Sequence, residues 1–147
     1  FTNNTVINNG NTDEYSDICV NNIIANSIQI NNINNTVNKY NLNNINTSIT
    51  NIDPQLHNIS QFTNGNQTIK NFKLLNPTNS SSIRHQIIAD HNFNGIVEIE
   101  GNFIFPDGTI NNNIINKKIQ VNKKGQNIYL TYLDNYWYIT NGGAKII

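Results

Sequence analysis

Apolar residues in the first half of the chain recur in a background of asparagine, serine and threonine. From residue 42 they follow one another at spacings of 3, 4, 3, 4 and 3. This alternation is typical of a coiled-coil seam, because it keeps one stripe of a helix facing a partner helix. Isoleucine at both seam positions favours three or more strands over two. The predicted seam consists of Leu42, Ile45, Ile49, Ile52, Leu56 and Ile59.

The pattern is less regular upstream, between residues 20 and 41. Ile28 and Ile30 alternate as they would in a strand, whereas the apolar residues from Ile30 to Tyr40 fit heptad spacing. The step from Tyr40 to Leu42 breaks that heptad register, which predicts a discontinuity in the coil. We expect a self-associating helical stalk over residues 20–60. The upstream members of its trimer interface are Ile30, Ile33 and Val37.

Pro54 interrupts the stalk, because it removes a backbone donor and disfavours helix at Asp53. Two helical interpretations remain open. The helix ends near Ile52, or Asp53 caps a second short helix that has Pro54 at its first position. Both give a kinked or interrupted stalk.

After residue 60 the chain changes to short strand-like runs separated by turn signals. The run 95–105 is the clearest, with Val97 and Ile99 on one face and Glu98 and Glu100 on the other. The fold class predicted is mainly β, with a coiled-coil-like stalk followed by an antiparallel sandwich or prism head, assembled as a homotrimer. The expected divisions are a polar segment at 1–19, the stalk at 20–60 and the head at 61–147. The expected strands of the head are 68–75, 83–89, 95–105, 110–121, 127–133 and 136–140.

Composition narrows the functional classes. Only 12% of residues are charged and the net charge is zero, while 35 residues are Asn and 26 are Ile. A neutral surface does not attract phosphate, so we expect no nucleic-acid partner. The single cysteine, Cys19, forms no intrachain disulfide. No apolar run reaches the length of a membrane span, so we expect no membrane insertion.

Candidate reaction chemistry is sparse. No nucleophile elbow, phosphate loop or zinc signature occurs in the sequence. Glu98 and Glu100 lie two residues apart on a wet strand face, where solvated charge is the expected role. His85, Asp90 and His91 are the only cluster that resembles metal ligands, and we expect surface or loop histidines there. We therefore expect no catalytic residues, no metal and no cofactor.

Aromatic side chains near the end of the chain are the best binding candidates, because they offer rigid apolar area with a polar tip. Alternation places Tyr136 and Tyr138 on one face and Trp137 on the other, where we expect Trp137 to be in the core. The candidate receptor-binding or glycan-binding residues are Tyr129, Tyr132, Tyr136 and Tyr138.

Three stretches give the chain a resemblance to the C-terminal part of trimeric viral fibres, both bacteriophage tail fibres and the fibre-like proteins of large DNA viruses. They are Ile45–Ser60, Asn94–Gly108 and Gly125–Gly143, the last ending in a tight turn and a Trp-Tyr strand. The resemblance implies a homotrimer at the virion surface, outside the cell. Its implied partners are other virion proteins and a host glycan or protein receptor, and its implied role is attachment.

Other interpretations stay open beside the fibre. Because Pro54 departs from a simple fibre stalk, residues 20–60 are compatible with β-type repeats as well as with a coiled coil. A monomeric carbohydrate-binding β-module of a secreted or cell-surface protein is the main functional alternative. A viral hydrolase tip would need a cleft with converging carboxylates, which the sequence does not offer.

Overall fold

The computed structural model describes residues 36–78, 83–112, 114–143 and 145–147. The chain divides into two units at residue 33, and all described residues belong to the second unit. Within the described ranges, eleven strands and one 3-10 turn, η1, follow one another. Their bounds are β1 (Val37–Asn41), η1 (Leu42–Asn44), β2 (Thr50–Ile52), β3 (Ile59–Thr63), β4 (Ile69–Leu74), β5 (Ile83–Ala89), β6 (Ile96–Glu100), β7 (Phe103–Ile104), β8 (Ile119–Val121), β9 (Asn127–Leu133), β10 (Tyr136–Gly142) and β11 (Lys145–Ile146).

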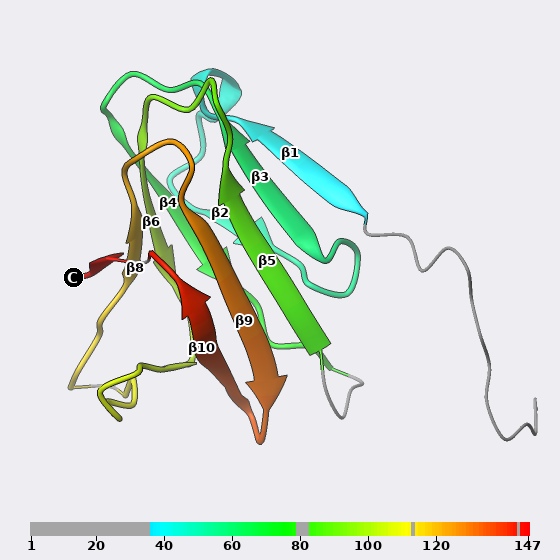
Figure 1. The fold of residues 1–147 in the computed structure, drawn as a ribbon, viewed down its shortest axis with the longest axis vertical. Coiled ribbons are helices and arrows are strands. Elements are labelled where there is room, and N and C mark those ends of the chain that lie inside the picture. The colour runs from blue at the N-terminus through cyan, green and yellow to red at the C-terminus, as the bar shows by residue number, and fades with distance from the viewer. Residues whose placement is uncertain (1–35, 79–82, 113, 144) are drawn as a thin grey trace, which may run out of the picture. The chain divides into compact units, whose positions relative to one another are not determined.

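The strands form two mixed sheets that share one apolar core. Sheet A has the strand order β1-β3-β5-β9-β10-β7, and sheet B has the order β11-β8-β6-β4-β2. Figure 1 shows β5, β9 and β10 of sheet A in front, with β6 and β8 of sheet B in the layer behind them.

The first six strands wind as a flat coil of three turns. Strands β1, β3 and β5 lie in sheet A, and β2, β4 and β6 lie in sheet B. In each sheet, strands from successive turns pair in parallel. In sheet A, Val37 pairs with Ile59 and Ile59 pairs with Gln86, so the two steps are 22 and 27 residues. Sheet B repeats both steps, from Thr50 to Phe72 and from Ile69 to Ile96. Because the steps agree, successive turns stay in register on both sheets.

Antiparallel strands complete both sheets after the coil. Strand β9 pairs with β5 and β10 pairs with β9 in sheet A, while β8 pairs with β6 and β11 pairs with β8 in sheet B. The β9–β10 hairpin closes through Asp134 and Asn135, whose φ angles are 50° and 70°. Positive φ at both central residues matches the right-handed twist of the flanking strands. The outermost strands on this side, β7 and β11, have only two residues each.

Aromatic side chains from both sheets fill the core. Phe62 of β3 and Phe72 of β4 lie with ring centroids 4.8 Å apart, and Tyr40 contacts both. Trp137 of β10 is fully buried, as its sequence pattern predicted, and its indole N–H donates to the carbonyl of Leu75 over 3.2 Å. Each buried ring stabilises the fold by roughly 1.5–3 kcal/mol through burial alone, so these contacts hold the two sheets together.

The predicted helical stalk is wrong for the described part of its range, residues 36–60. This part contains β1, η1, β2 and the start of β3, and no α-helix. Asn and Thr are poor helix formers, and Pro54 lies in the turn between β2 and β3. The chain buries its apolar residues between two sheets instead of against partner helices. The alternative of β-type repeats describes residues 36–60. Residues 20–35 of the predicted stalk, and the polar segment 1–19 with Cys19, lie outside the described residues.

The predicted head is correct in being mainly β, but its strand directions need correction. The sheets are mixed, because the first six strands pair with one another in parallel and β7 pairs in parallel with β10, whereas the pairs β5–β9, β9–β10, β6–β8 and β8–β11 are antiparallel. The expected boundary at residue 60 falls inside β3, and strands on both sides of it share one core. The strands expected at 83–89 and 127–133 have the predicted bounds, whereas the strand expected at 110–121 is reduced to β8.

Candidate functional site

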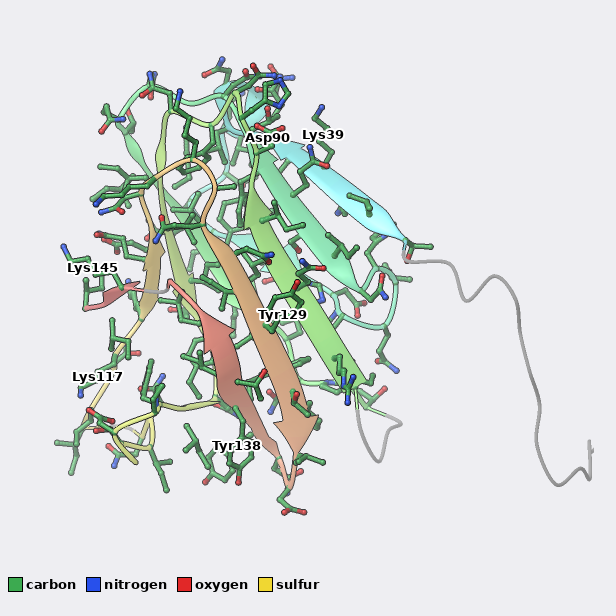
Figure 2. All side chains as sticks on the ribbon, in the orientation of Figure 1. Lys39, Asp90, Lys117, Tyr129, Tyr138 and Lys145 are labelled. Carbon is green, nitrogen blue, oxygen red and sulfur yellow. The ribbon has the colours of Figure 1, made fainter. Side chains whose placement is uncertain are left out.

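The outer face of sheet A carries polar side chains beside three of the predicted aromatic residues, Tyr129, Tyr136 and Tyr138. Along β5 and β9, alternate side chains point away from the core, and the register places Arg84 opposite Thr131 and Gln86 opposite Tyr129. Thr131 in turn lies opposite Tyr138 of β10. Figure 2 shows Tyr129 and Tyr138 on this face of β9 and β10.

Tyr129 is held in place by two amides. Gln86 donates from Nε2 to the Tyr129 hydroxyl over 3.1 Å and to Oδ1 of Asn127 over 2.9 Å. Asn127 donates from Nδ2 to the same hydroxyl over 3.3 Å. A hydroxyl has one donor and two acceptor positions, and both acceptor positions are filled here. The Tyr129 hydroxyl proton therefore remains for a ligand, and the residue is 43% exposed.

Two hollows lie on either side of Tyr129 and share Arg84. The larger, about 490 Å³, is lined by Arg84, Tyr129, Leu130, Thr131 and Thr140. The smaller, about 240 Å³, is lined by Asn58, Ile59, Arg84, His85, Gln86 and Tyr129. Thr140 lies at a bulge in the β9–β10 pairing and donates from its hydroxyl to the Tyr129 carbonyl over 3.1 Å. We call these two hollows with Arg84 and Tyr129 the Tyr129 site.

A second polar surface lies where the interior strands β4 and β6 of sheet B end. Adjoining hollows of about 280 and 230 Å³ share Lys73, Gly101 and Asn102. Nζ of Lys73 lies 3.9 Å from Oε1 of Glu100, so the local charges compensate each other. This surface has no aromatic lining residue, which makes it a weaker candidate than the Tyr129 site.

The predicted aromatic residues do not act as one set. Tyr129 lies between the two hollows, and Tyr136 and Tyr138 share the outer face of sheet A. The prediction for Tyr132 needs correction, because this residue is 6% exposed and its ring lies 5.1 Å from that of Trp137. Its strand alternation places it in the core, where no receptor can reach it.

The residues predicted for the trimer interface do not share one face. Leu42 and Ile52 are each 1% exposed in the core of their own chain, so they are not available to a partner chain. Ile30 and Ile33 lie outside the described residues. The other predicted members are exposed or half-buried: Val37, Ile45, Ile49, Leu56 and Ile59.

The fold separates His85 from the other two residues that resembled metal ligands, Asp90 and His91. His85 points into the core, Asp90 accepts a hydrogen bond of 2.8 Å from Nε2 of Gln61, and His91 is exposed. In the part of the chain that the structure describes, no three His, Cys, Asp or Glu side chains group as metal ligands. The expectation that His85 is a surface or loop residue is wrong, because it lies on the inward face of β5.

His85 forms a buried pair with Ser60. Nε2 of His85 lies 2.9 Å from Oγ of Ser60, and both residues are 1% exposed. Burial lowers the pKa of His85 to about 4 from 6.5, because the core disfavours the charged imidazolium. The imidazole is therefore neutral at pH 7. A serine beside a neutral histidine resembles part of a nucleophilic site, but both residues are only 1% exposed.

Two residues of the Tyr129 site did not emerge from the sequence. Arg84 and Gln86 lie on the outward face of a strand whose bounds were predicted correctly. Arg84 is also the only arginine of the chain. The sequence shows that these polar residues lie on the outward face of a strand, but it does not show which strand pairs with it. The pairing of β5 with β9 supplies that information.

Comparisons with protein-family models, with curated proteins and with solved structures gave no match for this chain. Among the residues described, there is no helix with the length and apolarity needed to cross a membrane.

Proposed function

We propose that this chain is an attachment module that binds saccharides at the Tyr129 site, as part of a virion-surface fibre. The observation that carries the proposal is the exposed ring of Tyr129, fixed between two hollows by Gln86 and Asn127. An aromatic ring offers an apolar surface to the C–H groups of a sugar. Hydroxyl and amide groups around it suit sugar hydroxyls, which both donate and accept hydrogen bonds.

The pre-organisation of Tyr129 supports this role. Because its hydroxyl already accepts two hydrogen bonds, the ring keeps its position before a ligand arrives, and less side-chain entropy is lost on binding. Thr131 and Thr140 add hydroxyl groups on the side of the larger hollow. A shallow, mixed surface of this kind favours weak binding, which multivalent display strengthens.

The test is saccharide binding by the folded chain and by variants at Tyr129. The wild type is screened against neutral and acidic oligosaccharides, and affinity for the strongest binder is measured by titration calorimetry. Tyr129→Ala should weaken binding by about fivefold, since an aromatic contact contributes roughly 0.5–1.5 kcal/mol beyond area burial. Tyr129→Phe, which keeps the ring, should lose less.

Tyr136→Ala is the matched control, because Tyr136 lies on the same face but lines neither hollow. Its affinity should equal that of the wild type. Absence of binding to every saccharide, or an equal loss in Tyr129→Ala and Tyr136→Ala, would overturn the proposal.

The fibre part of the proposal rests on the sequence resemblance and on the three-turn coil. Stacked coils contact only their neighbours, which suits long, thin proteins. A homotrimer would use exposed apolar residues such as Ile49 and Leu56. Light scattering tests this part, with a mass three times 16.6 kDa expected for the trimer. A mass of one chain would favour the alternative, a monomeric carbohydrate-binding β-module.

A further inference from the structure

The Tyr129 site carries a positive charge without a partner in the described part of the chain. Arg84 is exposed, lies on the outward face of β5 and lines both hollows. The three ion pairs found among the described residues all use lysines and lie elsewhere. None of the residues that line the two hollows is acidic.

The described carboxylates nearest along the strands are distant from Arg84 or engaged elsewhere. Asp90 lies six residues after Arg84, just past the end of β5, which is roughly 20 Å at the rise of an extended strand, and it accepts a hydrogen bond from Gln61. Asp134 is three residues beyond Thr131, the partner of Arg84 on β9, and this step corresponds to roughly 10 Å. Salt screens exposed charges over about 8 Å at physiological ionic strength. Neither carboxylate is in an ion pair with the guanidinium, because the ion pairs found among the described residues do not include Arg84.

We propose that the Tyr129 site selects saccharides that carry an acid group, a carboxylate or a sulfate, through Arg84. This inference rests on the proposed saccharide-binding function and names its ligand class. The planar guanidinium forms two parallel hydrogen bonds to such an oxyanion. Tyr129 contacts the face of the sugar ring, while Thr131 and Thr140 hydrogen-bond to its hydroxyls. The shared position of Arg84 allows an acid group to lie in either hollow.

The experiment compares three probes that differ in one group: a neutral hexose trisaccharide, the same trisaccharide with one hexuronic acid, and the same with one sulfate ester. Binding to the folded 147-residue chain is measured by calorimetry at low and at physiological salt. At least one acidic probe should bind about tenfold tighter than the neutral one, since charged hydrogen bonds are worth more than neutral ones. The difference should shrink as salt rises. The two acidic probes distinguish carboxylate from sulfate recognition.

Arg84→Gln should abolish the difference between acidic and neutral probes, and Arg84→Lys should keep part of it. Lys39→Gln is the control, because Lys39 is an exposed cation on the outer face of β1 that lines neither hollow (Figure 2). This variant should keep the full preference. Fluorescence of the buried Trp137 verifies that each variant is folded.

The outcomes separate this inference from the function on which it rests. Binding of all three probes with equal affinity, or a preference that survives Arg84→Gln, overturns the selection of acid groups and leaves saccharide binding intact. Absence of binding to all three probes and to the wider saccharide panel overturns both.

Discussion

Replacing Gly65 by alanine should destabilise the fold more than the same change at any other positive-φ glycine that the structure describes. Gly65 has φ +112° in the turn between β3 and β4, and a Cβ added there would lie 2.7 Å from the Cα of Gly95. Gly95 belongs to the turn between β5 and β6, one coil later, and Asn94 donates its N–H to the carbonyl of Asn64 over 2.9 Å. The two turns are therefore in direct backbone contact.

The magnitude follows from two contributions. A left-handed conformation costs a non-glycine residue roughly 1–2 kcal/mol, and forcing packed groups apart costs roughly a further 1–3 kcal/mol. Gly65→Ala should therefore lower the free energy of unfolding by about 2–5 kcal/mol. Gly125→Ala is the matched control, because Gly125 has φ +84° but no atom within 4 Å of an added Cβ. Its loss should be about 1–2 kcal/mol.

The assay is equilibrium unfolding in urea, followed by the fluorescence of Trp137, the only tryptophan of the chain. Both variants should keep the wild-type dependence of unfolding free energy on urea, so that the midpoints report stability. Equal losses in Gly65→Ala and Gly125→Ala would refute the reasoning. Equal losses would mean that the backbone contact between Gly65 and Gly95 adds nothing to the cost of the left-handed conformation in the free energy of unfolding.

Two further predictions concern acid stability and the β9–β10 turn. Because the pKa of His85 is about 4 in the folded chain against 6.5 in the unfolded chain, the unfolded state binds a proton first as pH falls. The contribution of this group to the free energy of unfolding should be constant above pH 6.5 and should fall by about 3 kcal/mol between pH 6.5 and 4. Urea unfolding at pH 7 and at pH 4.5 should therefore show a smaller loss of stability for His85→Gln than for the wild type. An equal loss in the two proteins would contradict this account. Asn135 has a φ of 70°, so Asn135→Gly should be at least as stable as the wild type and Asn135→Ala about 1 kcal/mol less stable. Thermal unfolding measures this difference. Equal melting temperatures for the two variants would argue against a conformational role of Asn135.

The late strands and turns could be predicted from the sequence because their signals are local. Strict alternation marked the buried Val97 and Ile99 and the outward Glu98. The turn residues at Gly108 and Asn135 have the positive φ angles that their residue types favour. Each of these signals spans a few residues, and the tertiary structure does not oppose it.

The stalk was mispredicted because a spacing of 3 and 4 is ambiguous in an asparagine-rich chain. Leu42 and Ile52 both face the core, but Ile49 and Leu56 are exposed between the strands. Asparagine occurs readily in turns, so it does not mark where a strand ends. A better signal lay at longer range, since Ile52 has Leu74 as its counterpart one turn later, 22 residues on. A repeat of this length indicates strands that stack in successive turns of a solenoid, whereas the heptad spacing does not reveal it.

The Tyr129 site was predictable only in part. Tyr129 was singled out for its aromatic ring, but Arg84 and Gln86 come from a strand more than 40 positions earlier. Their proximity depends on the reversal in which β9 pairs antiparallel with the last parallel strand, β5. Residue types alone do not specify this reversal, and a site assembled across it becomes visible only in three dimensions.

The short strand β7, which lies beside β10 at one edge of sheet A, has a consequence for how copies of the chain meet. Strand β7, which ends sheet A, has only two residues, too few to template another strand, and its Ile104 is already bridged to Ile110. Natural proteins use such blunt edges to resist edge-to-edge association. Strand pairing between copies of this chain is therefore disfavoured at the β7 edge of sheet A.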